Sequence, residues 1–376
     1  MPPRHVDVAV AVPVAERPAP PPDVWRLQRL VPVRITSAEE RDVLFVTVDG
    51  TRHALSRRNA SVVVDGGAPL PYATFDGAEL EHEGRTYAGR LVVAAHPEQG
   101  LRLENWVDVE SYVEGVVASE VALWSAPPAF LEAQAIAARS YALGTLERRA
   151  RDGRAFLQDG VLDQAYRGRF RPDAAGRARG LDARLRDAVT ATRGRVLSFG
   201  GRVADARFHA SCGGHTASGL DVFGPEAPPG GTALCAGCRA DSAWSVRLDA
   251  ADLGRAAESL GLDSLGVPYP TRTDPTGRWL EVELRGTFGV KPLSALELRR
   301  AIGWDRMKST YVLSWRQGPD GGAEIVGRGR GHGVGLCQEG ARDLAERGYD
   351  AVSILAHYYP GLRVGVANLG APAPAR

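Results

Sequence analysis

The sequence predicts an α+β fold, because strand-like and helical patterns fall in separate stretches of the chain instead of alternating regularly. Residues 31–107 consist of short β-like runs divided by turn dipeptides such as Asp49-Gly50, which predicts a small N-terminal β-rich lobe. From Val109 onward, apolar residues recur at helical spacing. Near the C-terminus, an alternating glycine-rich loop over residues 327–335 leads into a further helix.

The elements follow in order from these local patterns. Apolar and β-branched runs between turn signals predict strands at Val31–Ile35, Val43–Val48, Ser61–Val64, Gly89–Ala94, Val196–Phe199, Ala204–His209, Leu280–Leu284, Tyr311–Trp315 and Ala323–Val326. The last two are expected to form a hairpin around the Asp320-Gly321-Gly322 turn. Apolar residues three and four positions apart predict helices over residues 109–123, 129–151, 181–192, 249–260, 294–302 and 338–347.

These patterns divide the chain into four parts. We expect a disordered Pro/Ala-rich tether over residues 1–30, the β-rich lobe over 31–107, a core over 108–366 and a disordered tail over 367–376. The N-terminal apolar run is short and is interrupted by Asp7, so the chain shows no clear signal peptide.

Composition excludes several classes of protein. The 46 basic and 45 acidic residues nearly cancel and no basic run is present, so we expect no nucleic-acid partner. No stretch approaches the roughly 18 consecutive apolar residues of a membrane helix, so no membrane span is expected. Four cysteines among 376 residues are too few for a disulfide framework.

Glu120 is the most informative carboxylate in the sequence. It follows Val116 by four residues and Tyr112 by eight, which places it on the apolar stripe of the first predicted helix. Burial disfavours the charged form of a carboxyl group and raises its pKa towards the range that a general acid needs. The alternative is a carboxylate at a helix end that is paired with an arginine, for instance Arg139.

Two polar residues, Gln134 and Arg139, interrupt the otherwise small and apolar second helix. Buried polar groups need hydrogen-bond partners. These side chains therefore either orient Glu120 or a substrate, or form a hydrogen bond between packed helices.

A metal-ligand pattern occupies residues 209–238. Two short-spaced ligand pairs lie roughly twenty residues apart, which is the arrangement that closes a tetrahedral Zn²⁺ site. The expected ligands of this structural zinc are Cys212, His215, Cys235 and Cys238, with His209 as a spare. The alternatives are a Cys235–Cys238 disulfide or a set of unrelated side chains. Cys337 stands apart, and we expect it to be a free or buried thiol.

The glycine-rich loop is not a nucleotide-binding motif, because neither a P-loop nor G-x-G-x-x-G is present. Glycine at every second position forfeits side-chain packing, so we expect a sugar ring or the helix of Glu120 close to this backbone. His332 can donate, accept and titrate near neutrality, and we expect it near the Glu120 carboxylate or a sugar, with Gln338 beside it. The alternative is a strand edge packed beneath the second helix, with His332 bonded to backbone.

Six ordered blocks carry a family resemblance. They are VESYVEGVVASEVALWSAPPAFLEAQAIAARSYAL from Val109, DQAYRG from Asp163, FHASCGGHT from Phe208, TGR from Thr276, GRGHGVGLCQEGA from Gly329 and HYYPG from His357. Together they resemble the stage II sporulation protein D family, also called SpoIID/LytB or amidase-enhancer domains, over roughly residues 85–365.

The resemblance implies a peptidoglycan lytic transglycosylase that works outside the cytoplasmic membrane. Members cleave glycan strands stripped of stem peptides, often after an N-acetylmuramoyl-L-alanine amidase, and some carry zinc near the block that matches residues 209–215. The single essential glutamate of the family falls on Glu120. The residues then expected to bind substrate are Gln134, Arg139, Gln164, Tyr166, His332 and Gln338.

A single carboxyl group is sufficient for this reaction. Ordinary glycosidases use two carboxylates, whereas in a lytic transglycosylase the muramyl C6 hydroxyl attacks within the same molecule and leaves a 1,6-anhydromuramyl end. Two alternatives stay open. A non-catalytic glycan-binding or amidase-enhancing module is disfavoured by the presence of Glu120. A zinc hydrolase is disfavoured because thiolate-rich four-ligand sites are usually closed.

Overall fold

The structure is a computed structural model that describes residues 30–39, 41–153, 155–169, 179–225, 227, 232–238, 243–286 and 289–367. The tether and the tail expected at the two ends lie almost entirely outside these described residues. The chain forms two compact units, one made of residues up to Val196 and from Gly365 onward, the other of Leu197–Val364. The predicted boundary at residue 107 lies inside the first unit.

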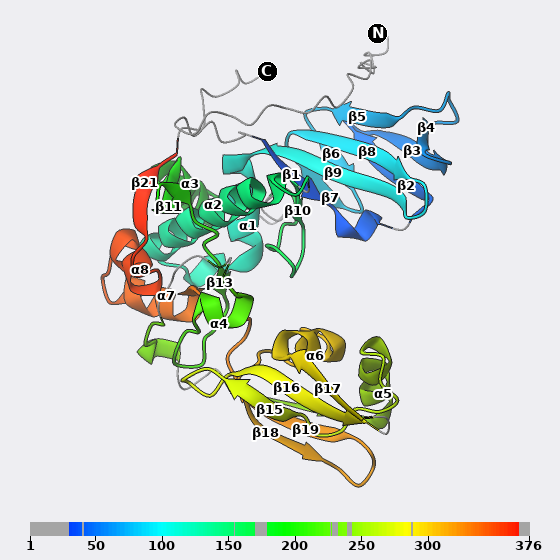
Figure 1. Cartoon of the computed structure of the whole chain (residues 1–376). Helices are drawn as coiled ribbons and strands as arrows, with labels where there is room; N and C mark the ends of the chain where they lie inside the picture. The colour runs from blue at the N-terminus through cyan, green and yellow to red at the C-terminus, as the bar shows by residue number, and fades with distance from the viewer. Residues whose placement is uncertain are drawn as a thin grey trace. The chain divides into compact units, whose positions relative to one another are not determined.

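The N-terminal part of the first unit consists of two five-stranded sheets (Figure 1). Their strands are β1 (Leu30–Arg34), β2 (Val43–Val48), β3 (Thr51–Arg58), β4 (Ser61–Val64), β5 (Tyr72–Asp76), β6 (Leu80–His82), β7 (Arg85–Tyr87), β8 (Arg90–His96), β9 (Gly100–Asp108) and β10 (Leu157–Gln158). The strand orders are β10-β1-β9-β8-β5 and β4-β3-β2-β6-β7. Neighbouring strands are antiparallel except β1 and β10. Asp49 and Gly50 have positive φ angles of 47° and 82°, as the two-residue turn between β2 and β3 requires.

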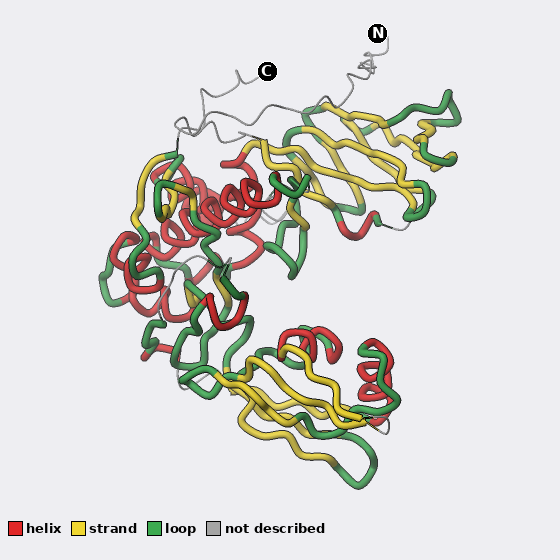
Figure 2. Tube along the Cα trace, in the orientation of Figure 1, coloured by secondary structure: helices red, strands yellow, loops and turns green. Residues whose placement is uncertain are grey.

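Three helices complete the first unit and cluster together in Figure 2. They are α1 (Val109–Glu120), α2 (Pro128–Ala150) and α3 (Arg179–Ala191). The Asp108 side chain caps α1 by accepting a hydrogen bond from the Glu110 N–H, and proline occupies the first position of α2, where no intrahelical donor is lost. Most of α2 is buried, and its many alanines allow its neighbours to approach closely.

A buried ion pair joins these helices. The fully buried Arg139 of α2 donates from Nε to Glu110 Oε1 at 3.0 Å and from Nη2 to Glu110 Oε2 at 2.6 Å. Glu110 Oε1 also accepts the Gly194 N–H at 3.1 Å, and Arg139 Nη1 donates to the Arg195 carbonyl at 3.1 Å. One bidentate pair therefore fixes α1, α2 and the turn that follows α3.

The remaining strands are β11 (Arg195–Phe199), β12 (Arg202–Val203), β13 (Phe208–His209), β14 (Ala243–Leu248), β15 (Tyr269–Thr273), β16 (Trp279–Gly286), β17 (Gly289–Ser294), β18 (Val312–Gln317), β19 (Ala323–Arg328), β20 (Leu336–Cys337) and β21 (Arg363–Val366). The remaining helices are α4 (Gly219–Phe223), α5 (Ala250–Ser259), α6 (Ala295–Ile302), α7 (Gln338–Glu346) and α8 (Ala351–Tyr358). The chain enters the second unit within β11 and leaves it within β21.

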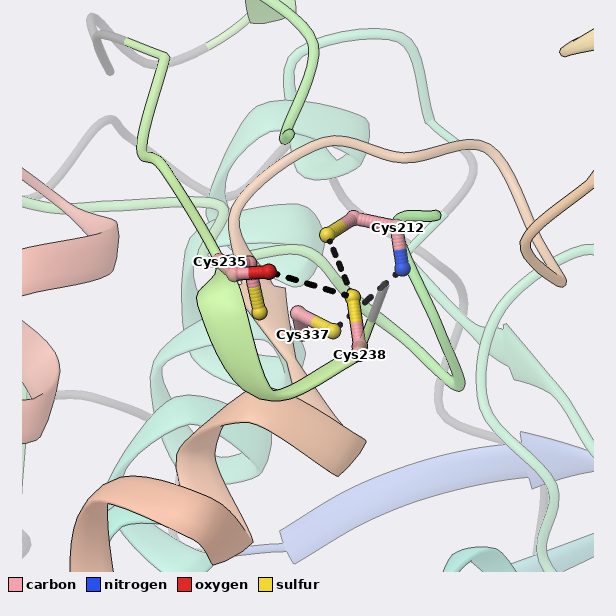
Figure 3. A group of neighbouring side chains, drawn as sticks. All are labelled: Cys212, Cys235, Cys238 and Cys337. Atoms are coloured by element: carbon pink, nitrogen blue, oxygen red, sulfur yellow. Dashed lines mark hydrogen bonds between the residues drawn. The ribbon is translucent and has the colours of Figure 1, made fainter. Parts of the chain in front are cut away.

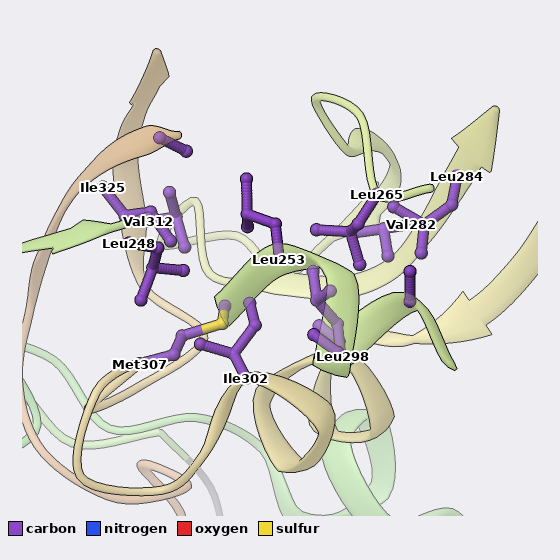
Figure 4. Packing of buried hydrophobic residues seen from close by; sticks show 14 of the residues in the cluster. Leu248, Leu253, Leu265, Val282, Leu284, Leu298, Ile302, Met307, Val312 and Ile325 are labelled. Carbon is purple, nitrogen blue, oxygen red and sulfur yellow. The ribbon is translucent and has the colours of Figure 1, made fainter. Parts of the chain in front are cut away.

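Part of the second unit has its own apolar core. The sheets β14-β19-β18 and β15-β16-β17 pack with α5 and α6 around buried side chains that include Leu253, Val282 and Leu298 (Figure 4). Capping boxes begin both helices, at Asp249 in α5 and at Ser294 in α6. Elsewhere in this unit, β13 and β20 pair in parallel, and the pairing brings the loop after β13 beside the start of α7.

The predicted α+β class is confirmed, as are the β-rich lobe, the β18–β19 hairpin and the helix after the glycine-rich loop. The strand predicted over Ala204–His209 is reduced to β13, because the Ala206 N–H turns back to the Ala204 carbonyl. Among the described residues, no helix combines the length and the apolar character needed to cross a membrane.

Replacing Arg139 by methionine should strongly destabilise the protein. The Glu110 carboxylate would stay buried without its cation, which typically costs about 3–5 kcal/mol. Denaturant unfolding should therefore show this loss in the free energy of unfolding. The control is Arg90→Met, since Arg90 forms an exposed pair with Asp76 at 2.8 Å and should lose less than about 1 kcal/mol. Equal losses in the two variants would contradict this role of Arg139.

Candidate functional site

Glu120 is the last residue of α1, and its side chain is partly buried. Its Oε1 accepts a hydrogen bond of 2.6 Å from the backbone N–H of Ala165. Arg139, the cation suggested as its partner, is instead bonded to Glu110, ten residues earlier on the same helix. The carboxyl group of Glu120 is therefore held by a neutral donor.

The loop that carries Ala165 is anchored by the carboxylate of Asp163. This carboxylate accepts hydrogen bonds from the Tyr141 hydroxyl at 2.7 Å, from both terminal nitrogens of Arg149 at 2.7 and 2.8 Å, and from the Gln158 N–H at 2.8 Å. Asp163 is the first residue of the DQAYRG block, but its position in the sequence did not predict that it anchors this loop. The anchor fixes the backbone donor that meets Glu120.

Three residues predicted to contact substrate are bonded within the protein instead. Arg139 is held in the ion pair with Glu110. Gln164 accepts from the Tyr112 hydroxyl at 2.9 Å, and the Tyr166 hydroxyl donates to Asn105 at 2.7 Å. All three side chains are buried, which gives them a positioning role. A Cβ on Gly115 of α1 would lie 2.7 Å from the Tyr166 ring, so this close packing requires glycine.

The pKa of Glu120 is raised, and the main cause is burial of its carboxyl group. The hydrogen bond from Ala165 acts in the opposite direction, because it stabilises the carboxylate. The C-terminal end of α1 adds a negative dipole end near the same group, which also disfavours the charge. Burial thus favours the protonated form of Glu120, which is the form that a general acid needs.

Gln134 of α2 is 0% exposed, and neither atom of its side-chain amide has a hydrogen-bond partner among the described residues. It lies one turn before Ala138, whose carbonyl accepts from Gln164 Nε2 at 3.4 Å. Gln134 is thus on the helix face that approaches the loop of Ala165. A buried amide of this kind calls for a water or a ligand.

The second site is a cluster of four buried, free cysteines in the second unit (Figure 3). The sulfur atoms of Cys212, Cys235, Cys238 and Cys337 all lie within 4.8 Å of one another. The Cys212 N–H donates to Cys337 Sγ at 3.3 Å, and the Gly214 N–H donates to Cys238 Sγ at 3.2 Å. Neighbouring thiols that donate to Cys238 lower its pKa and favour the thiolate.

This donor set fits a tetrahedral thiolate-binding metal. Zinc–sulfur bonds of about 2.3 Å place tetrahedral sulfurs about 3.8 Å apart, which the observed grouping allows. Backbone N–H groups that point at sulfur are the outer partners such thiolates need. A Cβ on Gly340 of α7 would lie 2.0 Å from Cys235 Sγ, so glycine makes room for the cluster.

The fourth member differs from the sequence prediction. Cys337 joins the cluster because β20 pairs with β13 and brings it beside Cys212. His215 lies outside the group, and its Nδ1 lies 3.0 Å from the Thr216 carbonyl. His209 is also outside; its Nδ1 lies 3.1 Å from the Val334 carbonyl, and burial lowers its pKa to about 3.

The glycine-rich loop packs against the protein's own chain. Gly329, Gly331, Gly333 and Gly335 all have positive φ, so the loop is not the regular strand that was considered. Added Cβ atoms would lie 2.1–2.7 Å from atoms of residues 207–211 and from the Arg278 guanidinium. This packing within the second unit accounts for the glycines without a sugar or the helix of Glu120.

His332 is packed edge-on against the rings of His209 and Phe223, with ring centroids 5.5 and 5.2 Å apart. Its Nδ1 accepts the Val334 N–H at 3.0 Å, and burial lowers its pKa well below the usual value. Gln338 begins α7, and its Nε2 has no partner among the described residues. Glu120 and His332 belong to different compact units, so their proximity stays a prediction.

Comparison with known proteins shows which family this chain resembles. Residues 97–199 match the family model described as SpoIID, stage II sporulation protein. This range contains Glu120, Gln134 and the Ala165 loop. The SpoIID match covers residues 97–199, and together with the relatives described next it confirms the resemblance seen in the sequence.

Relatives extend the similarity beyond that range. The chain is 28% identical to an uncharacterized protein of Brachyspira hyodysenteriae over 78% of this chain and 76% of that protein. It is 26% identical to the stage II sporulation protein D of Bacillus subtilis, over 70% of this chain and 76% of that one. It is also 26% identical to the amidase enhancer of Bacillus subtilis, over 66% of this chain but 39% of that protein. These names support a role related to the cell wall.

Glu120→Gln should stabilise the protein at neutral pH. The folded state binds the Glu120 proton more tightly than the unfolded state, so the contribution of this group to stability falls as pH rises from the unfolded pKa of about 4.3 through the raised folded value. Glutamine carries no charge to bury. Thermal unfolding at several pH values should therefore show that the variant is more stable than the wild type near pH 7, and that this difference disappears below about pH 4. A difference that is the same at every pH would contradict the burial cost.

Proposed function

We propose that the protein is a lytic transglycosylase that cleaves peptidoglycan glycan strands with Glu120 as its single acid and base. The observation that carries the proposal is the environment of this carboxyl group. It is partly buried, its pKa is raised, and among the described residues it is held by a backbone N–H and not by an arginine. A cationic partner would instead favour the charged carboxylate and lower its pKa.

In the proposed mechanism, protonated Glu120 donates its proton to the glycosidic oxygen, and the bond to the muramyl C1 breaks. The carboxylate that results then takes the proton of the muramyl C6 hydroxyl, whose oxygen bonds to C1. The product carries a 1,6-anhydromuramyl end, and Glu120 returns to its protonated form. No water is consumed, so a second carboxylate for activating water is unnecessary.

Gln134 remains a proposed substrate contact, because its amide has no hydrogen-bond partner among the described residues; since the side chain is fully buried, a bridging water would carry this contact to the sugar. Gln338 and His332 remain proposed substrate contacts of the second unit, considered by itself. The substrate class is glycan stripped of stem peptides. It suits a protein that works outside the cytoplasmic membrane with an N-acetylmuramoyl-L-alanine amidase, which the name of the amidase-enhancer relative favours.

The second candidate function is a non-catalytic module that binds glycan or enhances an amidase. The name of the amidase enhancer of Bacillus subtilis supports it. A binding module has no need for a carboxyl group that burial keeps ready for protonation. The geometry at Glu120 therefore favours catalysis.

The proposal includes a structural Zn²⁺ ion held by Cys212, Cys235, Cys238 and Cys337. Four thiolates leave no open position for substrate or water, so such an ion supplies folding energy rather than chemistry. These residues would join three segments of the second unit: the loop after β13, the turn at residues 235–238 and the start of α7. The same donor set argues against a zinc hydrolase.

Glu120→Gln should abolish cleavage of peptide-free glycan. Glutamine keeps the shape of the side chain but cannot transfer the proton, so the rate should fall by at least about 10²–10⁴. The rate is measured as the formation of anhydro ends by mass spectrometry. Glu114→Gln, the same change on the same helix, serves as the control and should keep its activity within about twofold. A folded Glu120→Gln protein that cleaves at the rate of the control would contradict the mechanism.

The metal proposal is tested by a pair of substitutions. Cys337→Ser should lose most bound zinc and unfold at a lower temperature, because a structural site with three thiolates holds the ion much less tightly. His215→Ala should keep one zinc per chain, because this side chain lies outside the cysteine cluster. Elemental analysis of protein purified under reducing conditions decides the matter. Zinc retained in Cys337→Ser but lost in His215→Ala would restore the ligand set expected from sequence spacing.

A further inference from the structure

Large apolar side chains stand exposed on both chain segments that meet at Glu120. Trp124 follows the end of α1 and is 76% exposed. Val161 and Leu162 precede the Ala165 donor and are 72% and 54% exposed. Single exposed apolar residues are common on any surface, but three on the two segments that meet at one partly buried carboxyl group call for an explanation.

Chain geometry limits how far these residues lie from the carboxyl group. Trp124 follows Glu120 by four positions, which corresponds to at most about 14 Å between their Cα atoms. Leu162 precedes Ala165 by three residues, which is at most about 11 Å, and the Ala165 nitrogen lies 2.6 Å from Glu120 Oε1. The backbone at Trp124, at Leu162 and at the adjacent Val161 is therefore within a few sugar residues of the proposed proton donor.

Both segments are held in place by contacts that leave these side chains outside. Leu123, next to Trp124, is buried, and the Ala126 carbonyl accepts a hydrogen bond from Arg184 of α3. Asp163, next to Leu162, forms the network of hydrogen bonds that anchors its loop. The exposure of Trp124 and Leu162 therefore belongs to fixed backbone, which favours a preformed binding surface.

We propose that Trp124, Val161 and Leu162 form an apolar platform that binds the glycan strand beside the bond to be cleaved. The inference rests on the proposed function and adds a subsite to it. A pyranose ring presents a face of C–H groups that an indole ring can cover, and the N-acetyl methyl groups of the strand suit the aliphatic pair. An aromatic anchor beside a few polar groups is the usual composition of a ligand site.

Binding and cleavage can be tested separately. We would titrate the Glu120→Gln protein, which keeps the surface but lacks the acid, with a peptide-free tetrasaccharide of alternating N-acetylglucosamine and N-acetylmuramic acid in a calorimeter. Adding Trp124→Ala should raise the dissociation constant by about tenfold. Trp124→Phe should recover most of the lost affinity. Phe199→Ala, which removes a 51% exposed aromatic of the second unit, should leave it unchanged within about twofold.

Two results would overturn the platform. One is equal affinity in Trp124→Ala and its parent, which includes the case that neither binds the tetrasaccharide. The other is unchanged glycan affinity together with weaker binding of Trp124→Ala to an N-acetylmuramoyl-L-alanine amidase, which would make the patch a protein contact. Neither result depends on whether Glu120 is the acid, because that question is decided by cleavage in the Glu120→Gln protein alone.

Discussion

Arg139 lies fully buried in α2 with its guanidinium group against the Glu110 carboxylate, and the positions of the helices around Glu120 depend on this pair. Two parallel hydrogen bonds fix α1 to α2, and further bonds from the same two side chains reach Gly194 and Arg195 after α3. A bidentate pair of this kind sets orientation as well as distance. The end of α1 is thereby set relative to the neighbouring helices.

The same pair keeps Arg139 away from Glu120. The Arg139 guanidinium is bonded to Glu110 and to the Arg195 carbonyl, and the hydrogen bond that Glu120 accepts from the described residues comes from the Ala165 N–H. Structure and proposed chemistry are thus divided between two glutamates of one helix. Two features of the second unit have structural roles. The cysteine cluster joins three segments, and the glycine-rich loop packs closely against residues 207–211. The protein keeps its proposed chemistry on a single side chain.

Patterns that are local in sequence predicted the fold class, α1 and the position of Glu120 on its buried stripe. They could not tell which glutamate pairs with Arg139, because Glu110 and Glu120 lie on the same helix. Cys337 was missed because its neighbours in the cluster come from a distant segment, and only the β13–β20 pairing unites them. Ala165 acts through its backbone N–H, which no residue type reports. The contacts between distant segments therefore could not be predicted from the sequence.

The identity of the cleavage product tests the central claim most directly. Wild-type protein would be incubated with peptide-free glycan strands, and the new ends would be examined by mass spectrometry. The account predicts 1,6-anhydromuramyl ends, each lacking one water relative to a reducing end, because the C6 hydroxyl rather than water attacks C1. New reducing ends would mean hydrolysis and a second catalytic group. Strands left intact by protein that still binds them would identify a non-catalytic glycan-binding module.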